Sequence, residues 1–232
     1  MIRFSVLGFK GGVGKSTIAF LLAKELARKY KVLLVDRDNV NTISNLFGIR
    51  DGLINALEEE RPGSYMVTIG NLRVLNLTAL FPRYLPSLER IVPEYKRVIG
   101  DADILITDNP PNLDEICELE FKAYRLATGE AHCNSVFVTT PGIALRLTLT
   151  HMNEVPKILR TWVPDLAYAK LTALVINMVK GEVGDIPVER KVIIPFKNDL
   201  FYSGLRIGTE LVEIDQLVKY AEEAIENNNS GK

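Results

Sequence analysis

The sequence predicts an α/β domain built on a mostly parallel central sheet with helices on both faces. Apolar runs alternate with helix-like runs nearly to the end of the chain, and several of the apolar runs are continuous. Continuous apolar runs are typical of strands covered on both faces, and their alternation with helices is typical of parallel sheets. The 232 residues suit one such domain. We expect it to span residues 1–232, with residues 227–232 as a frayed tail.

The first half of the chain predicts strands at residues 2–7, 31–36 and 72–77, each of which is apolar almost throughout. Between the first two, residues 17–30 carry small and apolar side chains at helical spacing, which predicts a helix. The polar, turn-rich residues 50–71 predict an excursion on the surface.

The second half continues the same alternation. A helix is expected at residues 85–99, interrupted near Pro93, and another at residues 112–126, where Asn112 and Glu115 have capping-box spacing. The other predicted elements are strands at 103–108, 135–140, 171–177 and 192–196, helices at 143–160 and 209–226, and a surface excursion at 180–191.

The composition is that of an ordinary globular protein, with 47% hydrophobic and 25% charged residues. A formal net charge of −1 gives no overall attraction to nucleic acid or to a membrane. The two cysteines, Cys117 and Cys133, form no C-x-x-C pair, so buried thiols are expected instead of a metal site. Because the sequence shows neither a signal peptide nor a long apolar run, we expect a cytoplasmic protein.

The most informative motif is the glycine-rich loop GFKGGVGKST at residues 8–17. Its place between a strand and a helix favours phosphate binding, because glycines let backbone N–H groups surround phosphate oxygens next to the positive end of the helix dipole. Lys15 is expected to reach the outer phosphates, Ser16 to bind Mg²⁺, and Thr17 to contact an inner phosphate. The common pattern has glycine at position 9, whereas this chain has Phe9 followed by a second lysine, Lys10.

Three acidic residues are expected at the same edge of the sheet as this loop. Asp36 and Asp38 end one strand and Asp108 ends another, and ligands of open parallel sheets gather outside the carboxyl ends of the strands. Asp108 is predicted to hold Mg²⁺ through water together with Ser16, since Mg²⁺ keeps several waters. Asp38 is predicted to position the attacking water. For Asp36 two roles stay open, a magnesium ligand and a tie between loops.

Together these residues resemble the deviant-Walker-A ATPases, a family that includes ParA, MinD and their archaeal relatives. The matching segments are KGGVGKST at 10–17, LLVDRD at 33–38, ILITDNPP at 104–111, VFVTTPG at 136–142, VIN at 175–177 and IIPFKND at 193–199. The resemblance covers roughly residues 2 to 210 and implies a P-loop NTPase fold.

The resemblance also implies a slow, partner-stimulated ATPase that forms a homodimer around two ATP molecules and Mg²⁺. The implied catalytic residues are Lys10, which would reach phosphates held by the other subunit, together with Lys15 and Asp38. Asn177 matches the asparagine that binds adenine. The implied nucleotide-binding residues are Lys10, Gly11, Gly12, Val13, Gly14, Lys15, Ser16, Thr17, Asn177, Pro195 and Phe196.

Such an ATPase would act as a switch that positions or partitions a cargo such as DNA, division machinery or a surface appendage, with a protein activator or cargo partner. Nonspecific DNA binding stays open. The acidic C-terminal helix argues against membrane binding, and the cysteine spacing argues against an iron–sulfur cluster. Two alternatives are a noncatalytic ATP-dependent adaptor and an ATP-dependent ligase similar to dethiobiotin synthetase, which usually lacks the leading lysine.

Overall fold

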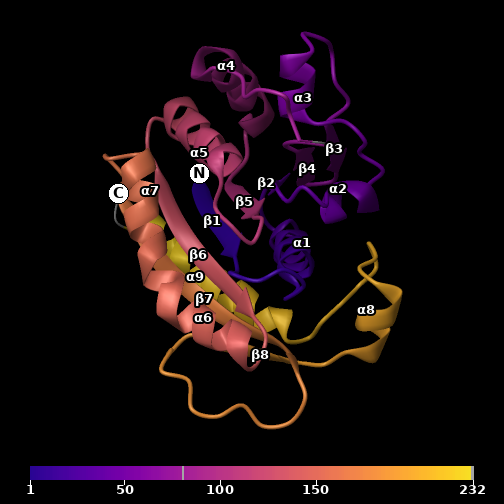
Figure 1. Ribbon diagram of the computed structural model, residues 1–232, viewed down its shortest axis with the longest axis vertical. Coiled ribbons are helices and arrows are strands. Elements are labelled where there is room, and N and C mark those ends of the chain that lie inside the picture. The colour runs from indigo at the N-terminus through magenta and orange to yellow at the C-terminus, as the bar shows by residue number, and fades with distance from the viewer. Residues whose placement is uncertain (80, 231–232) are drawn as a thin grey trace.

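The computed structural model describes residues 1–79 and 81–230, and in this part of the chain eight strands form one sheet (Figure 1). The strand order is β3-β4-β2-β5-β1-β6-β7-β8, and only β3 runs antiparallel to its neighbour. This sheet, with helices on both faces, confirms the predicted P-loop NTPase fold class.

The strands are β1 (Ile2–Leu7), β2 (Val32–Asp36), β3 (Met66–Ile69), β4 (Leu72–Asn76), β5 (Ile104–Asp108), β6 (His132–Thr139), β7 (Tyr168–Val179) and β8 (Lys191–Pro195). The helices are α1 (Lys15–Leu26), α2 (Thr42–Leu46), α3 (Leu53–Glu58), α4 (Leu88–Ile99), α5 (Glu115–Thr128), α6 (Ile143–His151), α7 (Val155–Trp162), α8 (Asn198–Ser203) and α9 (Ile214–Ser230).

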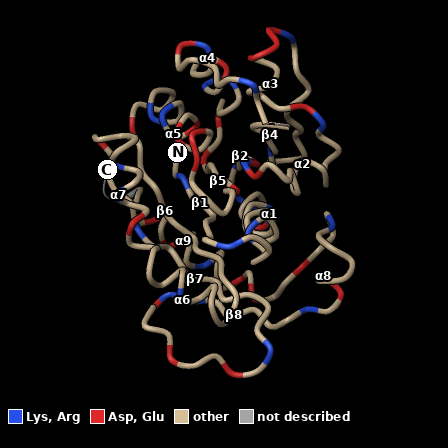
Figure 2. The backbone as a smooth tube through the Cα atoms, viewed as in Figure 1, with Lys and Arg blue, Asp and Glu red and all other residues tan. Residues whose placement is uncertain are grey.

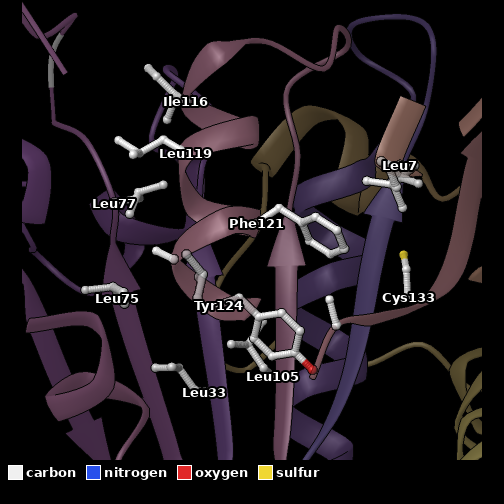
Figure 3. Close-up of a cluster of buried hydrophobic side chains, with 14 of the residues drawn as sticks. Leu7, Leu33, Leu75, Leu77, Leu105, Ile116, Leu119, Phe121, Tyr124 and Cys133 are labelled. Carbon is white, nitrogen blue, oxygen red and sulfur yellow. The ribbon is translucent and has the colours of Figure 1, made fainter. Parts of the chain in front are cut away.

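Alternate residues of the central strands supply two hydrophobic cores, one on each face of the sheet. Leu33 and Leu105 pack in the core that includes α4, α5 and α7, where Phe121 and other α5 side chains lie over them (Figure 3). Leu34 and Ile106, one position further along, pack with α1 and α9 on the other face. Because successive side chains of a strand point to opposite faces, β2 and β5 must be apolar at every position that is covered.

The region predicted as a surface excursion, residues 50–71, contains two regular elements that the sequence did not indicate. The short helix α3 buries Leu53 and Ile54, and β3 pairs with β4 at the edge of the sheet. Four- and six-residue elements give too little periodicity to be recognised, and β3 is only partly buried. The other predicted excursion, residues 180–191, is irregular as predicted over residues 180–190, whereas Lys191 begins β8.

Three helices differ from the prediction, in the residue that caps α5, in the continuity of α4 at its proline, and in a break between α6 and α7. Asp114, and not Asn112, caps α5, because its carboxylate accepts a hydrogen bond from the Cys117 N–H at 2.9 Å. Helix α4 continues through Pro93 without interruption. The helix expected at 143–160 is two helices, α6 and α7, separated by a 3₁₀ turn at Met152–Glu154.

The C-terminal helix begins later and ends later than predicted. It starts at Ile214 and not at residue 209, and it extends to Ser230, so residues 227–230 of the expected frayed tail are helical. Residues 231 and 232 lie outside the described residues. No helix in the described ranges is long and apolar enough to cross a membrane.

Candidate functional site

The carboxyl ends of the central strands bring the predicted loop and acids together. β1 lies between β5 and β6, and the glycine-rich loop follows it directly. Asp36 and Asp108 are register partners at the ends of the neighbouring strands β2 and β5, and Val6 of β1 is the partner of Asp108 on its other side. The topology thus places both acids beside the loop, as ligand sites in open parallel sheets require.

The front of the loop is fixed against β6. A Cβ atom at Gly8 would lie 2.5 Å from the Val138 carbonyl oxygen, so only glycine fits where the loop leaves the sheet. Phe9 then packs against the ring of Phe137 at 5.8 Å and that of His151 at 5.9 Å between centroids. The phenylalanine that replaces the usual glycine therefore anchors the loop to β6 and α6.

The end of the loop opens α1 in a form suited to an anion. Gly14 has φ 95°, which favours glycine, and no side chain caps the first turn of α1, which also contains no acidic residue. The orphan N–H groups of that turn are therefore free of side-chain acceptors, and the helix dipole favours negative charge there. This is the arrangement that binds phosphate at helix N-termini.

Asn177 lies against the loop rather than pointing into open space. Its side chain is buried, donates from Nδ2 to the Val13 carbonyl at 3.0 Å and accepts from the Met178 N–H at 2.9 Å. Met178 has a positive φ of 59° where the register of β7 against β8 shifts. In this structure the Asn177 amide supports the phosphate loop, and its predicted contact with adenine stays a prediction.

The two lysines of the loop have opposite environments. Lys15 is buried, and its Nζ donates to the Lys10 carbonyl at 3.5 Å, whereas Lys10 itself is exposed. Burial lowers the pKa of Lys15, and the charges of Asp108 and Asp38 oppose that shift. Lys15 therefore lies close to both acids, and Lys10 is open to a second molecule.

Asp108 is a fully buried carboxylate that is only partly compensated. Neither of its oxygens has a hydrogen-bond partner of standard geometry among the described residues. Burial and then the charge of Asp36 raise its pKa well above the usual value, and the Ser16 side chain and Lys15 lie close enough to oppose the rise. A buried, unpartnered carboxylate beside a serine hydroxyl fits a hydrated Mg²⁺, which would supply the missing positive charge.

Asp36 has a different environment from Asp108. One oxygen accepts hydrogen bonds from the Ser44 N–H at 2.8 Å and from the Ser44 hydroxyl at 2.7 Å. Burial nevertheless raises the pKa of Asp36 to about 6. These bonds tie the end of β2 to α2, which favours the structural one of the two roles left open for Asp36.

Asp38 and the hydroxyls complete the site. Asp38 is partly exposed, and one of its carboxylate oxygens accepts from the Val40 N–H at 3.1 Å. Ser16 and Thr17 are partly exposed in the first turn of α1. The described residues contain no group of three or more His, Cys, Asp or Glu side chains that could hold a metal, so a magnesium site here depends on Ser16, a carboxylate and water.

A cavity of about 450 Å³ lies on the side of the loop that faces β7 and β8. Phe196 lines this cavity, whereas Pro195 is exposed and does not. The Lys180 ammonium lies 3.9 Å from the centroid of the Phe196 ring. The other lining residues are Lys10, Gly11, Gly12, Val13, Thr140, Pro141, Met178, Val179 and Glu182.

Lys180, Glu182 and Thr140 are cavity residues that sequence reasoning did not select for the nucleotide site. Their only signal was position, since Thr140 ends one predicted strand and Lys180 and Glu182 come shortly after another, at the carboxyl edge of the sheet. A larger cavity of about 670 Å³ lies around α8, and no residue of the glycine-rich loop lines it.

The fold and the loop define a P-loop nucleotide-binding protein. The chain matches the family model described as the CobQ/CobB/MinD/ParA nucleotide binding domain over residues 4–229, and it therefore belongs to this family.

Solved structures of low identity share the fold. A putative plasmid partition protein from Borrelia burgdorferi, bound to AMPPNP, is 19% identical with a TM-score of 0.68, and the match covers 96% of this chain and 98% of that one. The septum site-determining protein MinD from Pyrococcus horikoshii, complexed with Mg-ADP, is 21% identical with a TM-score of 0.59, with coverage of 96% and 95%.

Among curated proteins, the cytosolic Fe-S cluster assembly factor CFD1 of Chaetomium globosum is 30% identical over 158 residues, which is 59% of this chain and 51% of that protein. The chain spans between about a third and a half of the length of the curated relatives it matches.

Proposed function

We propose that this chain is an ATP-binding and ATP-hydrolysing switch that dimerises with ATP and positions or partitions a cellular cargo. The observation that carries the proposal is the contrast between the two lysines of the loop. Lys15 is buried beside Asp108 and Asp38, whereas Lys10 is exposed at the rim of the cavity. A cation in the position of Lys10 is available to nucleotide held by a second subunit.

The chemistry follows from where the charges lie. Lys15 and the first turn of α1 bind the phosphates, and Lys10 of the other subunit offsets negative charge that develops on the γ-phosphate. Ser16 and Asp108, the latter through water, would hold Mg²⁺, which would neutralise phosphate charge when bound. Asp38 orients the water that attacks the γ-phosphate. The base occupies the cavity beside Phe196.

The direct test measures the mass of the protein in solution with ADP and with ATP, together with ATP hydrolysis. We expect a monomer with ADP and a dimer with ATP, and hydrolysis that rises when a partner is present. Asp38→Ala is expected to trap the ATP-bound dimer by abolishing turnover. An Asp38→Ala protein that hydrolyses ATP at the wild-type rate would contradict the proposed mechanism.

Lys10→Ala separates the switch from its alternatives. The switch requires that Lys10→Ala lose both the dimer and the hydrolysis that depends on it. Lys29→Ala is a matched control, since Lys29 is an exposed lysine in the turn after α1 that pairs with Glu222. Retained turnover of a small carboxylic acid in Lys10→Ala would support a ligase, and an ATP-bound dimer without turnover under any condition would support an adaptor.

The nature of the cargo is tested with DNA and with vesicles. Figure 2 shows acidic and basic residues interspersed over the outer helices and loops, and several basic residues are paired with acids, including Lys157 with Glu154 and Arg190 with Glu223. We expect DNA binding, if it accompanies the ATP-bound dimer, to fall steeply with salt, because it would depend on phosphate contacts. We expect no binding to anionic vesicles.

Iron–sulfur cluster transfer is the second candidate, because a curated relative is named as an Fe-S cluster assembly factor. Cys117 and Cys133 are free and buried, at 0% and 1% exposure, and burial raises the pKa of Cys117 to about 11. A thiol with this pKa is a poor metal ligand. We therefore expect that anaerobic incubation with iron and sulfide leaves no protein-bound cluster, as measured by iron content after gel filtration.

A further inference from the structure

A buried cluster of charged side chains lies beneath the candidate site, on the α4–α5 face of the sheet. The Glu120 carboxylate of α5 accepts hydrogen bonds from Arg3 Nη1 at 2.8 Å and Arg3 Nη2 at 2.6 Å, and from Arg37 Nη1 at 2.5 Å. The Tyr95 hydroxyl of α4 donates to the same carboxylate. None of these four side chains is more than 4% exposed.

The charges of this cluster do not cancel. Burial opposes the ionisation of Glu120, but the charges of Arg3 and Arg37 lower its pKa to about 2. Burial raises the pKa of Tyr95 well above the usual value, so its phenol stays neutral. Arg3 and Glu120 alone would form a neutral, bidentate pair, and Arg37 adds a second buried cation. Because Arg3 alone can neutralise Glu120, the second buried cation is not needed to compensate this carboxylate.

Arg37 instead connects the segment that carries Asp38 with the end of β5 and with α5. It lies between Asp36 and Asp38 in the chain, and its backbone N–H donates to the Asp108 carbonyl at 3.0 Å. Its side chain donates to the Cys117 carbonyl at 3.3 Å as well as to Glu120, both in α5. Helix α5 begins at Glu115, directly after the loop that follows Asp108. The backbone of Arg37 therefore contacts Asp108 at the end of β5, and its side chain contacts α5, which follows the loop after Asp108.

We propose that Arg37 is a positioning residue for Asp38, and that its ion pair with Glu120 couples the loop carrying Asp38 to the loop that follows Asp108. The inference rests on the proposed function, since it assigns Asp38 a part in ATP hydrolysis. A movement of either loop is transmitted to the other through α5, so the water-orienting carboxylate and the magnesium-binding carboxylate change position together.

The test replaces Arg37 by methionine, which keeps the length of the stem and leaves Glu120 paired with Arg3. Arg37→Met is expected to lower kcat for ATP hydrolysis on the order of 10- to 100-fold, as expected for a misplaced catalytic group, with KM unchanged. Arg37→Lys is expected to restore part of kcat, because its ammonium can still bond to Glu120. Arg125→Met is the matched control, because Arg125 lies on α5 but pairs with Asp165 at the surface and not with Glu120.

A second measurement does not depend on hydrolysis. Amide hydrogen exchange in the nucleotide-free protein is expected to accelerate over residues 37–47 in Arg37→Met and to stay at the wild-type rate in Arg125→Met. If the wild-type protein hydrolyses no ATP, the proposed function fails, and the exchange rates alone decide whether the coupling exists.

Three results would overturn the inference. The first is wild-type kcat and wild-type exchange in Arg37→Met. The second is an equal loss of kcat in Arg37→Met and Arg125→Met. The third is a loss of kcat in Arg37→Met that accompanies a matching rise in KM and a lower midpoint of urea unfolding, because that pattern indicates a general structural role.

Discussion

Gly14 and Asn177 form a contact whose energy can be measured by a double-mutant cycle. A Cβ atom at Gly14 would lie 2.3 Å from Asn177 Nδ2, and Gly14 has φ 95°. Gly14→Ala therefore has two costs. A left-handed alanine costs about 1 kcal/mol, and the displaced Asn177 amide loses two hydrogen bonds worth about 1 kcal/mol each.

Asn177→Ala alone removes the same two hydrogen bonds, so it is expected to cost about 2 kcal/mol. In the double variant the alanine at position 14 meets no amide, and only the backbone strain is added. The free energy of unfolding should therefore fall by about 2 kcal/mol less than the sum of the two single changes, a coupling well beyond the usual additivity error.

Urea unfolding of the four proteins, followed by circular dichroism, measures this coupling. Gly129→Ala is the control for backbone strain, because Gly129 has φ 82° and its Cβ position has nothing within 4 Å. It should show no coupling with Asn177→Ala. Additive effects of Gly14→Ala and Asn177→Ala, within about 0.5 kcal/mol, would refute the reasoning.

Three further predictions concern charge. The pKa of Asp36 is raised to about 6, so the folded state binds more protons than the unfolded state. Stability therefore falls as pH rises from about 4 to about 6, by about 3 kcal/mol from Asp36. Asp36→Asn should reduce the fall in unfolding free energy without abolishing it, because the pKa of Asp108 is raised as well. Lys15→Met should abolish nucleotide binding measured by calorimetry, yet leave the unfolding free energy unchanged or raised, because it removes a buried ammonium. Tyr95→Phe should cost about 1 kcal/mol in urea unfolding, since Glu120 keeps both arginines; a cost above about 3 kcal/mol would contradict this.

The sequence predicted the central sheet well because its signals are local. Strands buried on both faces, such as β2 and β5, are continuous apolar runs, and the glycine-rich loop lies between a strand and a helix. The placement of Asp36 and Asp108 side by side followed from the topology of parallel sheets.

What the sequence could not show depends on contacts between distant residues. The hydrogen bond from Asn177 to Val13 joins residues that are far apart in the chain, and so does the ion pair between Arg37 and Glu120. An arginine between two aspartates is typical of an exposed segment, and a glutamate within a helix is typical of a solvated helix face. No local pattern therefore predicts that the two side chains are buried together. The short elements α3 and β3 were missed because tertiary packing, not periodicity, determines them.

The position of β1 in the sheet has a consequence for the order in which the protein folds. β1 precedes both of its neighbours, β5 and β6, by a long stretch of chain, and Ile2 is in register with Ile104. Because synthesis proceeds from the N-terminus, the glycine-rich loop is made long before the strands that hold it in place. Pairings of such large sequence separation are slow to form. The nucleotide site can therefore be assembled only after β5 and β6 have been made, although its glycine-rich loop is made before them.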